Sequence, residues 1–532
     1  MSATDFSDQF RTCQTTGLKV HRPAQRLIWI NAVSAVVFLL IGGVMAILIA
    51  LTKWQAIHLL EQDLFYRFVT AHGTNMLVFW IVFFEMAGLI FGSAVVLGSR
   101  FPGIAFGWFN WGLMITGAVM VNVMMFTGKA DVMFTAYPPL KAHPLFYLGI
   151  ILFAVGALLY CFQFLYALVI AKKEGWHKGS LPLFTFGLLT AAIIAIWTLL
   201  SGAIAFVPTF LWSLPKTIIP DGSFLRINQV DPEFFRIAFW GFGHSAQQIN
   251  LAATVAIWYL LAHLTTGAKP VNQKMCRIAF VLYLLGINLG SVHHNLVDPG
   301  LSATYRIFNT SYLFYAAVIG SLIHAFSLPA AVETAQRSKG LTRGLFEWLT
   351  KAPWSHPGFS GFALSFVIFG FLGGVTGVIL SVEQLNMVSH NTLRVPGHFH
   401  MTVVGGTTLA FMALTYYVIP LVLQRKLIGE KLAVYQTYIF AVGITIVSAG
   451  MTFAGIMGAP RRHYDIEMSN AVFQFPYATA IKPMLSLVGI GAIIAATGLF
   501  IFIGIAVLSV FFGEKIEPKV EKHVPPHAAG AA

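Results

Sequence analysis

Two histidines stand one residue apart in the segment Pro396-Gly397-His398-Phe399-His400, at the start of an apolar run that continues to about Val422. An α-helix turns by about 100° per residue, so residues i and i+2 point about 200° apart. The two imidazoles are therefore expected on opposite sides of one helix, where each could bind a different metal centre. An ionisable side chain is costly inside a bilayer, so its presence there indicates function. The alternative is a pair of histidines hydrogen-bonded to neighbouring helices.

The composition is that of a helical membrane protein. Hydrophobic residues make up 57% of the 532 residues, charged residues make up 10%, and the mean hydropathy is +0.76. A soluble chain of this length does not have such a composition. We predict an all-α, polytopic bundle of about 12 transmembrane helices, with approximate spans 27–51, 70–98, 104–127, 145–171, 182–210, 235–264, 275–292, 306–332, 358–382, 398–423, 434–457 and 482–512.

The basic residues predict the orientation of the chain in the membrane. Lysine and arginine gather in alternate loops, as the positive-inside rule requires, and the opposite loops are poorer in them. We therefore expect a multi-pass protein of the cell membrane, surrounded by lipid. It would have a cytoplasmic tail over 1–26, one integral-membrane catalytic domain over 27–513 and a second cytoplasmic tail over 514–532. The same distribution explains the net charge of +13 without nucleic-acid binding.

Six histidines are predicted at one depth, in the outer half of the membrane or at its outer edge. Two haems need up to three axial histidines, if one iron is six-coordinate and the other keeps an open face. His72 and His400 could bind the first haem, and His398 the second. His244, His293 and His294 would remain to bind one further metal, for which copper, zinc or iron are suitable. The alternative for the adjacent pair alone is an ordinary interfacial position.

Three arginines are candidates to bind the carboxylates of a haem. Arg461 and Arg462 lie between the last two predicted spans, and Arg236 lies about two turns before His244. A guanidinium can bind a carboxylate through two hydrogen bonds. An ordinary interfacial position is the alternative for each of them.

At this point the chain resembles subunit I of the haem–copper oxidase superfamily, most closely its B-type members. The resemblance covers nearly the whole chain. The matching stretches are Ala71-His72-Gly73, Phe239-Trp240-Gly241-Phe242-Gly243-His244, Val292-His293-His294-Asn295-Leu296-Val297-Asp298-Pro299-Gly300, His390-Asn391-Thr392, Val395-Pro396-Gly397-His398-Phe399-His400 and Ala459-Pro460-Arg461-Arg462. The resemblance implies a low-spin haem b on His72 and His400, and a high-spin b- or a-type haem on His398. It also implies a non-haem metal on His244, His293 and His294, with Arg236, Arg461, Arg462, His390 and Asn391 near the haem propionates.

The most important departure from this family lies four residues after His244. Oxygen-reducing members usually carry a tyrosine there, cross-linked to the histidine, whereas this chain has Gln248. Nitric oxide reductases of the superfamily place a glutamate there or lack the tyrosine. Reduction of two NO to N2O needs two electrons and two protons but no phenolic donor. We therefore expect nitric oxide reduction first, with His244, His293, His294, His398 and Gln248 as the catalytic set.

Two other functions stay open. The first is a B-type terminal oxidase that reduces O2 to water and translocates protons. The second is a membrane electron carrier that contains haem, which would not need three additional histidines. Three histidines without a carboxylate favour copper over iron at the non-haem site.

The electron donor is expected to come from outside this chain. Its three cysteines, Cys13, Cys161 and Cys276, form no CxxC, CxxCH or CxxxC motif, so no covalent haem or copper–thiolate centre is predicted. We expect a second subunit with copper or haem c, which receives electrons from cytochrome c, a cupredoxin or quinol.

A proton path is expected through polar residues within the spans. The resemblance implies a polar path along spans 235–264 and 306–332, but Gly320, Ile323 and Phe326 stand where hydroxyl side chains are expected. The acid in span 70–98 could instead be a neutral, hydrogen-bonded carboxylic acid. The candidates are Tyr259, Ser321, His324 and Glu85.

Overall fold

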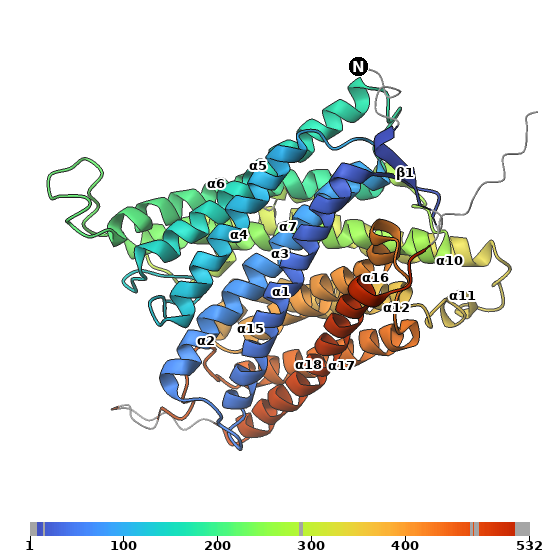
Figure 1. Ribbon diagram of the computed structural model, residues 1–532. Helices are drawn as coiled ribbons and strands as arrows, with labels where there is room; N and C mark the ends of the chain where they lie inside the picture. The colour runs from blue at the N-terminus through green and yellow to red at the C-terminus, as the bar shows by residue number, and fades with distance from the viewer. Residues whose placement is uncertain (1–7, 14–15, 287–290, 469–471, 473–477, 517–532) are drawn as a thin grey trace, which may run out of the picture.

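The computed structural model describes residues 8–13, 16–286, 291–468, 472 and 478–516. These residues form a bundle of long helices with one short β-hairpin near the N-terminus (Figure 1). Eleven of the described helices, some of them built from several consecutive elements, are long and apolar enough to cross a membrane. The prediction of an all-α membrane bundle is confirmed.

The seventh predicted span, 275–292, has no counterpart among these eleven membrane-crossing helices. It begins in α8 (Gln273–Gly286), which has 14 residues and therefore rises about 21 Å. Residues 287–290 of this span lie outside the described residues.

The elements follow each other along the chain in the order given next. They are β1 (Phe10–Thr12), β2 (Lys19–His21), α1 (Arg22–Lys53), α2 (Gln62–Thr74), η2 (Asn75–Trp80), α3 (Ile81–Phe91), η3 (Gly92–Val96), α4 (Ile104–Phe126), α5 (Pro144–Lys173), α6 (Leu183–Ser213), α7 (Pro232–Thr266), α8, η4 (Val292–His294), α9 (Ala303–Ile307), η5 (Phe308–Leu313), α10 (Phe314–Arg337), α11 (Glu347–Thr350), α12 (Pro357–Phe366), η6 (Val367–Gly373), α13 (Gly374–Ser381), α14 (Glu383–Ser389), α15 (Arg394–Phe399), η7 (His400–Thr408), α16 (Leu409–Leu423), α17 (Glu430–Ile456) and α18 (Ile481–Phe512).

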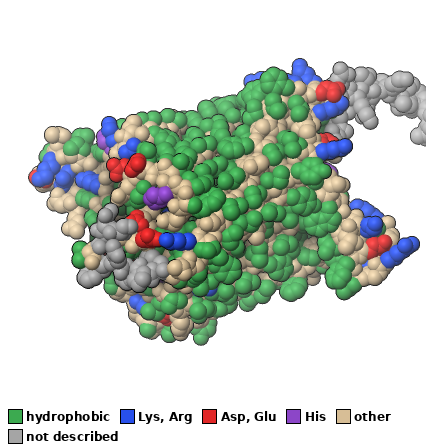
Figure 2. Space-filling view, turned by 90° about the horizontal axis from the view of Figure 1, so that it is seen from below, with side chains coloured by type: hydrophobic (Ala, Val, Ile, Leu, Met, Phe, Trp, Pro, Cys, Tyr) green, Lys and Arg blue, Asp and Glu red, His purple; other side chains and the backbone are tan. Residues whose placement is uncertain are grey.

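The surface has the distribution of polarity that a bilayer selects. Hydrophobic side chains cover the middle of the face in Figure 2, and charged side chains gather towards its two opposite ends. Trp197 is 59% exposed and Val169 is 57% exposed, although both are apolar and lie within long helices. Helices satisfy their own backbone polar groups, so such apolar surfaces can face lipid.

Part of the predicted N-terminal tail packs against the bundle. The hairpin of β1 and β2 buries Val20 completely. Arg11 Nη2 donates hydrogen bonds to the carbonyls of Leu421 and Val422 at 2.9 and 2.8 Å. Carbonyls in the last turn of a helix lack partners within the helix, so Arg11 satisfies the end of α16 and anchors the hairpin there.

Wide π-helical turns interrupt the helices that carry the key histidines. The π-helix η2 directly follows α2, which carries His72, and η7 begins at His400. Such turns are frequent at functional sites because they change the direction of the side chains that follow. The periodicity of the sequence did not predict them.

Glycines bring the two-histidine helix close to α17. A Cβ at Gly397 would meet Thr452 Oγ1, and would lie only 2.9 Å from the Thr452 backbone nitrogen. A Cβ at Gly455 would in the same way meet the backbone of Arg394. Small residues at such positions allow membrane helices to approach closely, and here they set the position of His398 and His400.

We predict that Gly397→Ala destabilises the protein by about 1–3 kcal/mol, because the added methyl group overpacks the contact with α17. Thermal denaturation of the purified complex in detergent would measure the loss. Gly504→Ala in α18 is the matched control, since a Cβ there meets nothing within 4 Å. Equal melting temperatures for the two variants would show that the α15–α17 contact does not limit stability.

Candidate metal and haem centre

His72 and His400 face each other across a gap that one metal atom can fill. Their ring centroids lie 6.3 Å apart and their planes differ by 21°. Two metal–nitrogen bonds of about 2.0–2.1 Å each, together with the two ring radii, account for this separation. The pair therefore fits the two axial positions of one six-coordinate haem iron.

The backbone leaves the correct nitrogen of each ring available. His72 Nδ1 donates to the Gly42 carbonyl at 3.0 Å, and His400 Nδ1 donates to the Pro396 carbonyl at 2.7 Å. A carbonyl oxygen only accepts, so each Nδ1 carries the proton and each Nε2 keeps its lone pair. This arrangement is usual for histidines that bind metals.

His398 faces a different set of neighbours, on η6 and α13. Its Nδ1 lies 3.1 Å from the Gly373 carbonyl and 3.0 Å from Thr376 Oγ1. A Cβ at Gly377 would lie only 2.9 Å from His398 Cε1, so glycine is needed there to make room for the ring. The rings of His398 and His400 thus lie among two different sets of neighbours, as expected from the angle between them.

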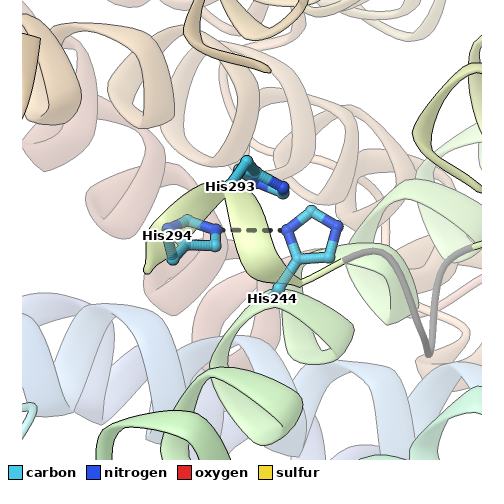
Figure 3. A group of neighbouring side chains, drawn as sticks. All are labelled: His244, His293 and His294. Atoms are coloured by element: carbon cyan, nitrogen blue, oxygen red, sulfur yellow. Dashed lines mark hydrogen bonds between the residues drawn. The ribbon is translucent and has the colours of Figure 1, made fainter. Parts of the chain in front are cut away.

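His244, His293 and His294 form a compact cluster (Figure 3). One ligand nitrogen from each ring lies within 4.8 Å of the other two. His244 Nδ1 and His294 Nε2 are 3.2 Å apart. The first histidine comes from α7, whereas the other two come from η4. Three imidazoles that converge in this way fit one copper, zinc or iron ion with a further position open.

A cavity of about 450 Å³ connects the cluster with His398. All three cluster histidines, His398 and Gln248 line it. Ligand pockets in proteins are commonly of this size, about 300–1,000 Å³. The cavity therefore brings together the predicted haem ligand, the predicted metal ligands and Gln248, which replaces the usual tyrosine of the family.

Arg461, which lines this cavity, and the adjacent Arg462 have buried side-chain atoms without partners. Arg461 Nε and Arg462 Nη2 are buried and make no hydrogen bond within the described part of the chain. Burial lowers the pKa of Arg461 to about 9, and the neighbouring Arg462 adds to this effect. Buried cations are costly unless an anion pairs with them, so this place fits the propionates of a haem.

Arg236 differs from these two arginines because it already has an anionic partner. Its Nε and Nη2 each donate to a different oxygen of Asp298 at 2.8 Å. Its guanidinium also lies 4.6 Å from the centre of the Tyr137 ring. Arg236 therefore holds the segment after the histidine pair in place, and its role at a propionate stays a prediction.

His390 and Asn391 both lie near Arg461, and their place beside the haem propionates stays a prediction. His390 lines the cavity, and the Asn391 carbonyl accepts a hydrogen bond from the Arg461 backbone nitrogen at 3.0 Å. Asn391 has a φ of +59°, a conformation that asparagine tolerates better than most residues.

Three of the four proton-path candidates lie beside the cavity. Tyr259 bonds to His324 Nδ1 at 3.0 Å, and Ser321 bonds to Tyr283 at 3.1 Å. Ser321, His324 and Tyr283 line the cavity. Glu85 does not belong to this group, since it lies buried in α3 with Oε1 unbonded within the described part of the chain.

Two contacts at the site were not expected from the sequence. The Trp240 ring stacks on His294 with centroids 3.9 Å apart and planes 1° apart. Thr376 contacts His398 from another helix. Trp240 lies four residues before His244, on the same face of α7, so its spacing was a usable signal. Thr376 carried no signal, because only the packing of η6 and α13 against α15 brings it close.

Comparison with known proteins identifies the family. A family model described as cytochrome c and quinol oxidase polypeptide I matches residues 26–494. The chain belongs to this family. It is 29% identical over 469 residues to cytochrome c oxidase subunit 1 of Thermus thermophilus, and the match covers 87% of this chain and 79% of the relative.

Two further proteins are similar to this chain. The chain is 24% identical over 451 residues to quinol oxidase subunit 1 of Bacillus subtilis, and the match covers 81% of this chain and 65% of the relative. A solved structure described as a haem–copper terminal oxidase dimer superposes with a TM-score of 0.83 at 25% identity, covering 93% of this chain and 85% of that one. The predicted superfamily is confirmed. None of these three is named a nitric oxide reductase, so the names favour the oxidase alternative.

We predict that His400→Ala and His398→Ala have different spectra. Loss of His400 should abolish the six-coordinate low-spin haem signal, because His72 alone cannot complete that coordination. Loss of His398 should abolish binding of CO to the high-spin haem. Absorption spectra of the reduced complex with and without CO would measure both effects, and identical spectra would contradict two separate haem positions.

We predict that alanine at His244, His293 or His294 lowers the content of one non-haem metal while both haems are retained. Each variant removes one of three ligands from the same ion. Metal analysis relative to haem content measures this, with His263→Ala as a control, because His263 Nδ1 bonds to the Ala268 carbonyl away from the cluster. Unchanged metal content in all three variants would refute a shared ion.

Proposed function

We propose that this chain is the catalytic subunit I of a respiratory membrane complex that reduces a small diatomic molecule. The observation that carries the proposal is the cavity that His398 lines together with His244, His293 and His294. A haem on His398 and a metal on the three histidines would place two redox centres around one substrate. A simple electron carrier would have no use for the second of these centres.

The residues present suit the groups that the family implies. We assign a low-spin haem b to His72 and His400, a high-spin haem to His398, and a copper ion in preference to iron to the three-histidine cluster. These groups would supply the electrons for reduction. The protein would orient the groups through the carbonyl-bound Nδ1 atoms and hold the propionates at Arg461 and Arg462.

We propose dioxygen as the first substrate. This reaction takes four electrons and four protons to form two water molecules. The names of the relatives, cytochrome c oxidase and quinol oxidase, support it. The same names favour reduction of dioxygen over the reduction of nitric oxide that was expected from the sequence.

Nitric oxide is the second candidate, and one observation favours it. The side chain beside His244 is Gln248, whose Nε2 lies 3.0 Å from His244 Nε2. An amide supplies neither an electron nor a readily released proton. Reduction of two NO with two electrons and two protons to N2O and water needs no such donor.

Electrons and protons would reach the site by separate routes. A partner subunit would pass electrons from cytochrome c, a cupredoxin or quinol, on the outer side of the membrane. We place both termini in the cytoplasm, on the basis of the basic loops. Protons would rise from the cytoplasmic side along Tyr259, His324 and Ser321, whereas Glu85 lies apart from these residues.

We predict that the purified complex consumes O2 with a reduced donor at a rate at least ten times its rate of NO reduction. The measurement compares O2 uptake with N2O formation under the same donor. The His398→Ala variant is the control for both reactions, because the site needs that haem ligand. N2O formation that exceeds O2 uptake would establish the second candidate and exclude the first.

A further inference from the structure

The orientation of the His244 ring distinguishes its two nitrogens. Nδ1 lies towards the other cluster histidines, 3.2 Å from His294 Nε2. Nε2 lies on the opposite side of the ring, 3.0 Å from the side-chain amide nitrogen of Gln248. Figure 3 shows the His244 ring turned towards His294 and His293 in this way. Nδ1 is therefore the atom that can bind a metal shared by the three rings.

A metal bound through Nδ1 restricts what Gln248 can do. The metal takes the lone pair of Nδ1, so the remaining ring proton must sit on Nε2. His244 is only 5% exposed, and a buried N–H without an acceptor is costly. The group beside Nε2 must therefore accept a hydrogen bond.

Gln248 can supply this acceptor without moving its backbone. It lies one helical turn after His244, so the two side chains share one face of α7. A half turn of the amide exchanges the places of its oxygen and nitrogen, which have nearly the same shape. Gln248 Oε1 is buried and has no hydrogen-bond partner within the described part of the chain. It is thus available to accept from His244.

We propose that Gln248 is a positioning residue whose Oε1 accepts the Nε2–H of His244 and so holds this imidazole in the tautomer that binds the metal through Nδ1. This inference rests on the proposed function in one respect, the assignment of a metal to the three histidines. It does not depend on which diatomic molecule is reduced. Gln248 would orient the ring through a hydrogen bond, where a cross-linked tyrosine does so through a covalent bond.

The test compares variants of the intact complex that differ only in the acceptor. Gln248→Leu removes the acceptor, and Gln248→Met nearly keeps the shape but leaves only a thioether sulfur, which accepts weakly. Gln248→Glu restores an acceptor. The neighbouring Gln247→Leu is the matched control, because Gln247 lies on the same helix and lines the same cavity.

Two measurements apply to each variant. Competition with a copper chelator gives the affinity for copper, and the infrared stretch of CO bound to that copper reports how its histidine ligands donate electrons. We expect Gln248→Met and Gln248→Leu to lower copper affinity by about 10–100-fold and to shift the CO stretch. We expect Gln248→Glu and Gln247→Leu to keep the affinity within about threefold of the unmodified complex.

Each result decides for or against the acceptor role. The low-spin haem spectrum shows which variants are folded. Either Gln248→Leu or Gln248→Met is sufficient for the test, provided that it keeps this spectrum. Unchanged affinity and CO stretch in that variant would overturn the proposal, and so would an equal loss in Gln248→Glu. If the copper results are as expected but the complex reduces neither O2 nor NO, then the proposed function fails and the role of Gln248 stands.

Discussion

The site depends on backbone carbonyls that accept hydrogen bonds from Nδ1 of imidazoles within the bundle. His72, His398 and His400 each make this contact, with Gly42, Gly373 and Pro396 respectively. Each hydrogen bond fixes the direction of a ring and leaves Nε2 as the only atom with a lone pair. A histidine that could rotate freely in an apolar interior would hold a metal poorly, so these contacts decide how these three rings can bind. They also require that α1 and η6 present the carbonyls at the right depth.

The three arginines of the candidate site differ in whether a carboxylate already pairs with them. Arg236 is neutralised by Asp298 through two hydrogen bonds and fixes the segment that follows the histidine pair. Arg461 and Arg462 have no such carboxylate in the described residues, although one side-chain nitrogen of each is buried. The free energy of burying a cation without an anion is high. An anionic group that enters the cavity would therefore be bound where these two guanidiniums lie.

Gln248 is the residue at which the chemistry of the site departs most from the family pattern. The family match covers most of the chain, and the histidines of the cluster lie within the matched range. The residue that contacts His244 from the next turn is nevertheless an amide. An amide can orient a ring through a hydrogen bond but cannot donate an electron. Under the proposed function, Gln248 would help to hold the geometry of the metal site and would supply no electron to the substrate.

The sequence by itself determined the class of fold and the identity of the candidate ligands. Apolar runs of sufficient length predict membrane helices because a bilayer allows few other structures, and the spacing of His398 and His400 indicated two directions on one helix. Only the tertiary structure decided the partners of each ring. The contacts of His398 with Thr376 and of His294 with Trp240, and the pairing of Arg236 with Asp298, join segments that are distant in the chain or that the pattern does not relate. The π-helical turns and the packed N-terminal hairpin were likewise not predicted, because hydrophobic periodicity reports which side of a helix is apolar. It does not report which neighbouring helix lies there, nor at what distance.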